Sequence, residues 1–238
     1  MRLHLRLVRA TLLSPSVRSL VFEVTGQRPF SYEPGQAIDL FVPTASGMTM
    51  KRPYSIASAP GFAGPARFEI AVTHVPDGAT SRALHALAEG AELDAEGPRG
   101  SFRRWVADRD LPALFVAAGS GLAPLRAMLQ PELAREVGPS VGLLFGCRTA
   151  EDVLWKNELE RWVEERPRFT LAVSLSRPHD TWTGATGHVQ RHAAEMVARL
   201  RPERVFICGL SAMVEAVERA LEDSGVPSKA IHFEEYDV

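Results

Sequence analysis

Hydrophobic and polar positions alternate with a period of two from residue 2 to about residue 102, as they do in half-buried β-strands. One helix interrupts this pattern, from residue 80 to about residue 88. Turn-forming clusters rich in proline and glycine separate the strand-like runs. The clearest runs cover residues 17–24, 37–42, 54–57 and 68–75, and the turn clusters cover residues 33–35, 59–61, 76–78 and 97–98. Short strands at this regular spacing predict a closed antiparallel barrel that carries a single helix.

From about residue 111 the pattern changes to compact apolar runs, each followed by a longer segment with helical spacing. The runs cover residues 113–118, 141–145, 169–173 and 205–208. We expect one helix with Pro124 near its first turn and further helices at 152–165, 187–200 and 211–223, the last with Gly225 as its C-terminal cap. Repeated strand–helix units predict a doubly wound parallel sheet. The charged segment 103–110 has no clear period, so we expect two domains, residues 1–104 and 105–238.

Composition narrows the class of protein. The 238 residues carry a formal net charge of -2 with 24% charged side chains, and the arginines are scattered, so neither disorder nor a nucleic-acid partner is expected. Two cysteines cannot supply the four thiolates of an ordinary iron–sulfur cluster, and we expect no metal site. The chain begins without the pattern of a secretory leader, and no run reaches the roughly 20 apolar residues of a membrane span. We therefore interpret the protein as cytoplasmic.

The segment Arg52, Pro53, Tyr54 and Ser55 carries the first chemical signal. A guanidinium group matches phosphate oxygens, and a flat phenol covers an aromatic ring. The segment resembles the flavin-binding signature of ferredoxin–NADP reductase-like proteins. This resemblance implies that the arginine pairs with the FAD pyrophosphate, that the tyrosine packs on the isoalloxazine ring and that the serine bonds near the flavin N5. Taken alone, a strand tyrosine and serine beside a chance arginine explain the tetrapeptide equally well.

A second segment, Gly78 to Ser81, opens the single helix of the barrel half. Free N–H groups and the positive end of a helix bind phosphate there, although a plain capped turn is the alternative. The family has a glycine, two residues and a serine at this place for the FAD pyrophosphate. The resemblance therefore implies a cofactor site that includes Thr73, Val75, Gly78, Thr80 and Ser81. The turn at residues 97–102 also resembles the family, and we assign it a structural role.

Two segments of the second half stand where an open parallel sheet binds ligands. Gly119, Ser120 and Gly121 follow the first apolar run and lead into the helix with Pro124, so the backbone can approach a dinucleotide pyrophosphate closely. Near the end of a later run lie Cys208, Gly209 and Met213. The resemblance implies that the cysteine borders the nicotinamide with the methionine behind it. We do not expect Cys208 to be a nucleophile, because hydride transfer needs no thiolate.

Three further residues, Arg148, Ser176 and Arg177, resemble the family's segments on the adenosine side of the dinucleotide. Arg177 next to Ser176 is better placed than Arg148 to hold the 2′-phosphate of NADP, while a plain surface arginine is the alternative. We assign no acid or base role to His188. The choice between NADH and NADPH stays open.

The order of these motifs along the chain agrees with a flavin-dependent NAD(P)H oxidoreductase. The resemblance implies bound FAD, with FMN as an open alternative, and catalytic roles for Tyr54, Ser55 and Cys208. It also implies a separate acceptor protein, such as a ferredoxin, an oxygenase component or an iron–sulfur subunit. Two other interpretations stay open: a nucleotide-binding subunit that docks inside a larger complex, and a dehydrogenase without flavin. Plant-type relatives end in an aromatic residue that stacks on the flavin, whereas Val238 ends this sequence.

Overall fold

The first half of the chain folds as a six-stranded antiparallel sheet in the order β4-β3-β6-β1-β2-β5. The computed structural model describes residues 1–26 and 30–236. An antiparallel bridge between Ile56 and Ile70 joins the two edges and closes the barrel. The elements are β1 (Arg2–Ser14), β2 (Val17–Thr25), β3 (Ala37–Pro43), β4 (Thr49–Ser55), β5 (Arg67–Thr73), α1 (Ala79–Ala86) and β6 (Glu92–Arg99). The predicted barrel with one helix is confirmed.

Alternating burial explains why the barrel strands form. On β1, Leu3, Leu5 and Leu7 point into the barrel core, while the residues between them are exposed. The expected strand at 54–57 was misplaced, because β4 runs from Thr49 to Ser55. Most of β4 is exposed on both faces, so its sequence has no apolar alternation to reveal it.

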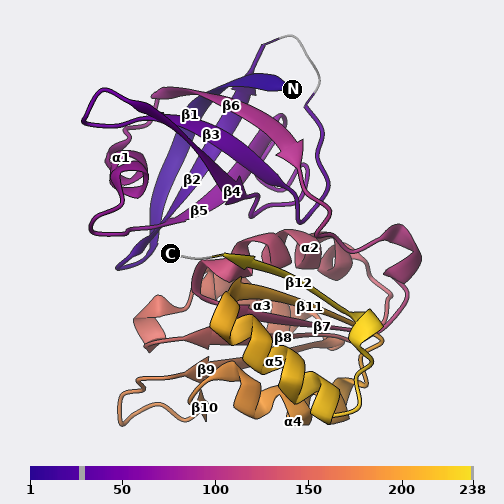
Figure 1. Ribbon diagram of the computed structural model, residues 1–238. Coiled ribbons are helices and arrows are strands. Elements are labelled where there is room, and N and C mark those ends of the chain that lie inside the picture. The colour runs from indigo at the N-terminus through magenta and orange to yellow at the C-terminus, as the bar shows by residue number, and fades with distance from the viewer. Residues whose placement is uncertain (27–29, 237–238) are drawn as a thin grey trace.

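The second half forms a parallel sheet in the order β10-β9-β8-β7-β11-β12. Its elements are β7 (Ala113–Ala118), α2 (Leu122–Ala134), β8 (Val141–Cys147), α3 (Lys156–Glu165), β9 (Phe169–Leu175), β10 (Ala185–Thr186), α4 (Ala193–Leu200), β11 (Arg204–Leu210), α5 (Ser211–Asp223) and β12 (Ile231–Tyr236). Helices α2 and α3 cover one face of the sheet, and α4 and α5 cover the other (Figure 1). The predicted doubly wound sheet is confirmed.

Several predicted boundaries differ from the structure. Helix α5 begins and ends where expected, and Gly225 follows it with a φ of 86°. Helix α4 begins later than expected, because the 3₁₀ turn η4 (Val189–His192) takes up the start of its segment. Helix α3 also begins later, because the turn η3 (Ala150–Asp152) and the left-handed residue Trp155 precede it. Strands β10 and β12 were not predicted.

The strand order places a switch point between β7 and β11. From β7 the chain winds through β8 and β9 to β10 on one side, and it returns through β11 and β12 on the other. Loops that leave the carboxyl ends of strands on either side of such a point diverge and open a crevice. Strand β12 ends on the side of the sheet that lies beneath the barrel (Figure 1).

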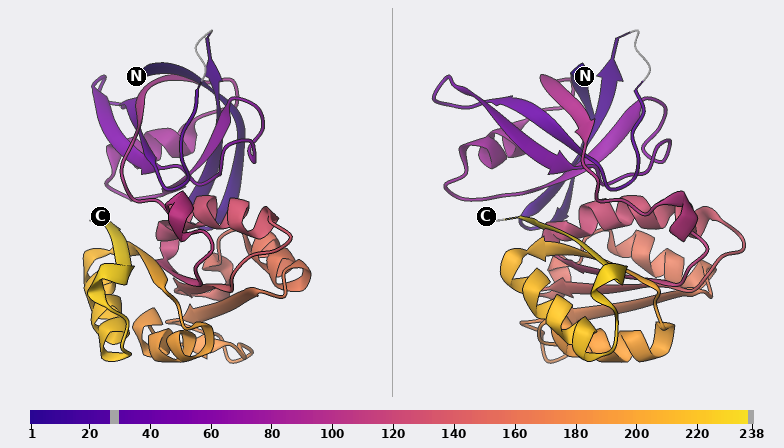
Figure 2. Two further views of the ribbon diagram at one scale, coloured as in Figure 1. Left: turned by 90° about the vertical axis from the view of Figure 1, so that its right-hand side faces the viewer. Right: turned by 45° about the vertical axis from the view of Figure 1, so that its right-hand side comes forward.

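The two halves share part of one hydrophobic core. Helix α2 lies between the barrel and the sheet in all three views (Figures 1 and 2). The core around α2 includes Val17, Ala57 and Ala71 of the barrel and Phe102 of the connecting segment. The connection from β6 to β7 contains only the short turn η1 (Val106–Asp108), in agreement with the missing period there. The domain boundary at residues 104 and 105 stays a prediction.

No helix in the described part of the chain is both long and apolar enough to cross a membrane.

Candidate functional site

The loops after β7 and β11 touch each other at the switch point. A Cβ atom added to Gly121 would lie 2.2 Å from the carbonyl oxygen of Cys208, so only glycine fits at position 121. Gly119, two residues earlier, has a φ of 54° and nothing within 4 Å of an added Cβ. One glycine therefore lets the two loops meet, and the other leaves open space beside the backbone.

The start of α2 has the features of an anion site. Gly119–Gly121 forms the 3₁₀ turn η2, and α2 follows at Leu122 with no side-chain cap on its first N–H groups. Pro124 stands in the first turn, where its missing N–H costs no helical hydrogen bond. The Leu122 N–H bonds to the carbonyl oxygens of Gly119 and Ser120 within η2, so the helix dipole and the open space at Gly119 are the features that favour a phosphate at this end.

Strand β4 presents the expected flavin residues on the barrel side. Arg52 is exposed, and the only partner that the described residues give its guanidinium is the carbonyl oxygen of Lys51, at 3.0 Å. Tyr54 packs its ring on the barrel core, and burial raises the pKa of its hydroxyl to about 12. Pro53, between them, is exposed and pairs with Asp39 of β3. Strand β4 therefore carries a guanidinium group that has no carboxylate partner among the described residues. Two residues later it carries a neutral phenol ring that is fixed on the core.

The start of α1 holds its polar side chains inward. Gly78 caps the helix without a side-chain hydrogen bond, which leaves the first N–H groups free of a side-chain cap. The Ser81 hydroxyl is buried, accepts from the N–H of Val75 at 3.1 Å and donates to the carbonyl oxygen of Gly78 at 3.1 Å. Thr80 is buried as well, with its hydroxyl 3.7 Å from the sulfur of Met50. Ser81 and Thr80 thus shape the turn, and the backbone N–H groups are the donors that face outward for a phosphate.

Strand β12 brings two residues to the site that the sequence analysis did not select for it. Ser55 donates to Glu234 Oε2 at 3.3 Å, and Glu234 lies beside Cys208 in the register of β11 and β12. Burial raises the pKa of Glu234, against the opposing effects of Ser55 and Arg99. No apolar alternation marks β12, because Phe233 is exposed while His232, Glu234 and Tyr236 are half-buried.

Tyr236, the second of these residues, lies against the loop after β7. Its hydroxyl donates to the carbonyl oxygen of Ala118 at 3.2 Å and lies 3.4 Å from the hydroxyl of Ser120. Burial is the main cause that raises its pKa. Val238 itself cannot stack on a ring, whereas the aromatic side chain of Tyr236, two residues earlier, lies against this loop.

Direct contacts join the barrel to the sheet at this site. Thr73 at the end of β5 donates to the Ser120 hydroxyl at 3.1 Å, and Ser55 at the end of β4 reaches Glu234. The loops expected to hold flavin and dinucleotide, those at residues 52–55, 73–81, 119–124 and 208–209, are thus linked to one another through short contacts where the barrel meets the sheet.

The end of β11 fits a shaping role better than a nucleophilic one. Cys208 is 2% exposed, and burial raises the pKa of its thiol, so the thiolate is disfavoured. An added Cβ on Gly209 would lie 3.1 Å from Met213 Cε, which places the methionine directly behind the glycine. Shape and polarity are what these residues offer a neighbouring ring.

The residues expected on the adenosine side also lie together. The N–H of Arg177 donates to the carbonyl oxygen of Arg148 at 2.8 Å, and the N–H of Ser176 donates to Cys147 at 3.0 Å. Arg148 and Arg177 are both exposed, and neither has an ion-pair partner among the described residues. Two unpaired guanidinium groups therefore project from adjacent segments at the carboxyl ends of β8 and β9.

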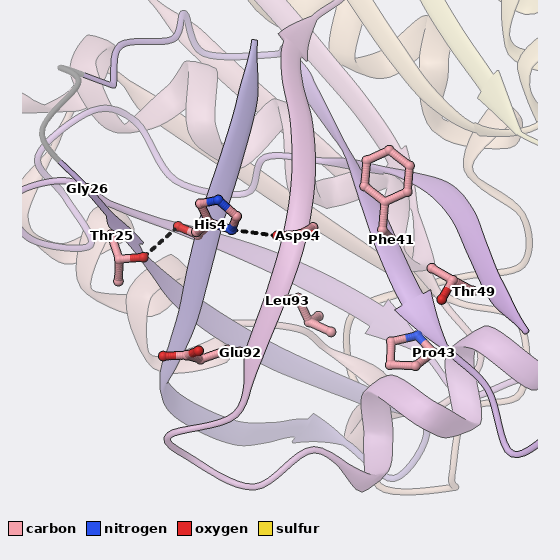
Figure 3. A pocket seen from close by; sticks show the side chains of 9 residues that line it. All are labelled: His4, Thr25, Gly26, Phe41, Pro43, Thr49, Glu92, Leu93 and Asp94. Atoms are coloured by element: carbon pink, nitrogen blue, oxygen red, sulfur yellow. Dashed lines mark hydrogen bonds and ion pairs between the residues drawn. The ribbon is translucent and has the colours of Figure 1, made fainter. Parts of the chain in front are cut away.

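A separate hollow of about 540 Å³ lies on the barrel and has none of these features. Figure 3 shows its lining, which includes the ion pair of His4 Nδ1 and Asp94 Oδ1 at 2.6 Å and the nearby Glu92. It is a shallow surface with acidic side chains and no helix start, which suits a dinucleotide poorly. We assign the site to the crevice between the domains instead.

Comparison with known proteins places both halves. Residues 4–104 match the family model of the oxidoreductase FAD-binding domain, and residues 115–219 match that of the oxidoreductase NAD-binding domain. A ferredoxin–NADP reductase of Sorangium cellulosum is 43% identical over 98% of this chain and 96% of its own length. The phenol hydroxylase P5 protein of Acinetobacter pittii is 29% identical over 94% of this chain but 62% of its own length. A crystal structure of a cytochrome P450 reductase from Amycolatopsis superposes with a TM-score of 0.86 at 27% identity, covering 99% of this chain and 69% of that one.

Proposed function

The chain belongs to the ferredoxin–NADP reductase family, and we propose that it passes electrons from a nicotinamide dinucleotide through bound FAD to a separate protein acceptor. The observation that carries this proposal is the convergence of the barrel strand ends and the dinucleotide loop on one crevice, through Ser55–Glu234 and Thr73–Ser120. Hydride transfer requires the two rings to be held face to face, and that crevice lies between the two binding halves.

The residues of the barrel fit FAD by their chemistry. Arg52 has a guanidinium free of carboxylates among the described residues, and α1 begins at an uncapped Gly78, so a diphosphate would meet one cation and a set of N–H donors. Tyr54 offers the flat face of a ring fixed on the core. Bound FAD would accept two electrons as hydride and release them one at a time. Thr73, Val75 and Thr80 would complete the FAD site with their backbone groups and the shape of their side chains.

The sheet domain would hold the dinucleotide. Its pyrophosphate would lie on the turn at Gly119–Gly121 and the start of α2, where space and donors coincide. Cys208 and Met213 would shape the nicotinamide side, with the buried thiol kept neutral. Ser55 and Glu234 form a donor–acceptor pair at the junction of the two domains, in position to hold a proton beside the flavin. The water-poor surroundings of Glu234 favour its neutral form.

Arg177 and Ser176 are our proposed site for a 2′-phosphate, with Arg148 beside them. We favour NADPH as the donor, because both exposed arginines lack a partner of opposite charge among the described residues. NADH as donor is the alternative, and a comparison of the rates at which NADH and NADPH bleach the flavin distinguishes the two. The acceptor that we propose is an iron–sulfur protein, because similar chains are named as a ferredoxin–NADP reductase and as the reductase subunit of a glycine betaine monooxygenase. A ferredoxin or an oxygenase component has this chemistry. The cytoplasmic location stays a prediction.

Flavin bleaching tests the proposed function. Purified protein reconstituted with FAD should be yellow, lose its flavin absorbance under anaerobic NADH or NADPH, and reduce an artificial dye. Yellow protein that ignores both dinucleotides would instead indicate a docking subunit. Protein that binds no flavin would overturn the proposal.

A further inference from the structure

A buried ion pair crosses the boundary between the two domains. Arg126 of α2 donates from Nη1 to Glu69 Oε2 of β5 at 2.9 Å and to the carbonyl oxygen of Ala57 at 2.7 Å. The two side chains belong to opposite domains, and the residues are only 7% and 6% exposed. Among the described residues, Arg104 and Glu132 form a second ion pair across the predicted boundary that is at least as buried, but Arg104 lies in the connecting segment, whereas Glu69 lies on a barrel strand.

The ion pair is enclosed by a second layer of contacts from the sheet domain. Trp155 donates from Nε1 to Glu69 Oε1 at 2.9 Å, while its ring lies 4.5 Å from the guanidinium carbon of Arg126. Glu158 of α3 accepts from Arg126 Nε. Trp155 has a φ of 49° and a ψ of 35°, a left-handed conformation that a bulky side chain rarely adopts. This strained backbone conformation occurs at the residue whose indole donates to Glu69 across the domain boundary, which indicates that the contact has a functional role.

Adhesion between the domains does not require this ion pair. Removing two charges from water costs as much as their attraction returns, so an apolar pair of similar volume would hold the domains at least as firmly. A buried pair does, however, accept only one geometry, because each charge left without its partner is costly. Its effect is therefore to select a single relative placement of α2 and β5.

That placement determines the geometry of the crevice. Arg126 stands one helical turn after Leu122, where α2 leaves the dinucleotide loop. Glu69 stands four residues before Thr73, whose hydroxyl donates to Ser120 in the same loop. Two contacts thus join strand β5 to α2 and the loop before it. The hydrogen bond of Thr73 with Ser120 is exposed at the crevice, and the ion pair of Glu69 with Arg126 is buried behind it. The exposed hydrogen bond competes with water, so the buried ion pair is the firmer of the two.

We propose that Arg126, through Glu69, is a positioning residue for hydride transfer. It fixes the loop at Gly119–Gly121 against the flavin face of the barrel, without touching flavin or dinucleotide itself. The inference rests on the proposed function and concerns how the two rings are brought to reacting distance. A small misplacement of the reacting atoms slows such a step while leaving the affinity for each ligand nearly unchanged.

The test replaces both charges of the pair together, and Glu158, whose side chain is 18% exposed, keeps the Gln130 amide as a donor at 3.1 Å. The double variant Glu69→Gln, Arg126→Met should bind FAD normally and change the KM for the dinucleotide less than twofold, but reduce flavin about tenfold more slowly at saturating dinucleotide. A second measurement needs no turnover. Spin labels at Arg9→Cys on β1 and Val163→Cys on α3, both exposed, should give a narrow distance distribution in the parent and a broader one in the double variant.

A matched control removes an ion pair that lies within the barrel. Arg67 Nη2 and Glu23 Oε1 are 3.0 Å apart and join β5 to β2. The variant Glu23→Gln, Arg67→Met should retain both the parental rate of flavin reduction and the narrow distance distribution. Loss of rate in this control to the same degree would overturn the proposal, because any lost ion pair would then suffice.

Other outcomes also decide the matter. A parental reduction rate in the Glu69→Gln, Arg126→Met variant, a raised KM with an unchanged maximal rate, or a slow rate with an unchanged distance distribution would each overturn the positioning role. If that variant does not fold, Arg126→Lys keeps the charge but cannot reach Glu69, Glu158 and Ala57 together, and it should show the same two changes to a smaller degree. Failure of the proposed function is distinguishable, because the parent itself would then not be reduced.

Discussion

Gly121 has no room for a side chain, because an added Cβ would lie 2.2 Å from Cys208 O and 3.1 Å from Gly209 N, both backbone atoms. Gly121→Ala should therefore push the loops after β7 and β11 apart, lower the free energy of unfolding by about 1–3 kcal/mol and raise the KM for the dinucleotide at least tenfold. Urea unfolding and steady-state kinetics measure the two effects. Gly90→Ala is the control, since Gly90 has a φ of 89° but nothing within 4 Å. Gly90→Ala should lower the free energy of unfolding and leave the KM for the dinucleotide unchanged. A parental KM in Gly121→Ala would contradict the close contact between the loops after β7 and β11.

Arg177 is the residue on which the choice between the two dinucleotides rests. Charge-assisted hydrogen bonds to a phosphate are worth about 1.5–3 kcal/mol, so Arg177→Ala should raise the KM for NADPH roughly tenfold or more and leave the KM for NADH unchanged. Arg199→Ala, an exposed arginine of α4, should change neither. Equal effects of Arg177→Ala on both donors would refute its phosphate role.

Glu234 should make stability depend on pH in a direction opposite to that of a salt-bridged carboxylate. Burial raises its pKa in the folded protein above the ordinary 4.5, so its contribution to stability is fully present below the ordinary value and is lost as pH rises through the raised value. Glu234→Gln stays neutral throughout and should lose this part of the pH dependence. Urea unfolding of both proteins from pH 4 to pH 8 measures it. Parallel curves would show that Glu234 ionises with its ordinary pKa.

Single residues with a distinctive chemistry were the ones that the sequence could identify. Arg52, Tyr54, Gly119 and Cys208 stand in short motifs whose residue types suit phosphates and rings, and the structure gathers those motifs around one crevice. Glu234 gave no such signal, because its importance comes from β12 lying beside β11, a pairing between distant segments. The roles of the individual side chains stay predictions.

Elements were predictable where their burial followed one period. Helix α5 and strand β5 present one buried face each and were found with boundaries close to those observed, whereas β4 is mostly exposed and was misplaced. The late start of α4 reflects a 3₁₀ turn, which shares the spacing of the first helical turn. Contacts between elements, such as that of Arg126 with Glu69, leave no periodic signal at all.

Three arginine side chains surround one buried carboxylate at the C-terminal end of α2. Glu132 has a side chain 2% exposed, with guanidinium nitrogens of Arg104, Arg109 and Arg135 at 3.7, 3.5 and 3.6 Å. These separations exceed hydrogen-bond length, so the carboxylate acts mainly by its charge. Desolvation lowers the pKa of Arg104, whose side chain is also 2% exposed.

Removing this one negative charge should therefore destabilise the connection between the domains. Glu132→Gln leaves the buried Arg104 without its counter-charge, and we expect the free energy of unfolding to fall by about 3–5 kcal/mol. The control is Glu136→Gln, which removes an exposed carboxylate four residues further along the chain. This variant should change the free energy of unfolding by less than about 0.5 kcal/mol. Thermal and urea unfolding measure the difference. Equal stability of the two variants would contradict a structural role for the arginine cluster.

The whole molecule should unfold as one unit, because its two domains share a core. All four tryptophans lie at residue 105 or later, so their fluorescence reports on the sheet domain and its connection, whereas flavin release reports on the crevice beside the barrel. We expect both signals to change at the same urea concentration, and excess FAD at about 1,000 times its Kd to add about 4 kcal/mol to each. Glu69→Gln, Arg126→Met should keep a single transition, because the shared core remains and adhesion does not require the ion pair. Separate transitions in the parent would show that the domains are coupled only through the ligand and not through the shared core.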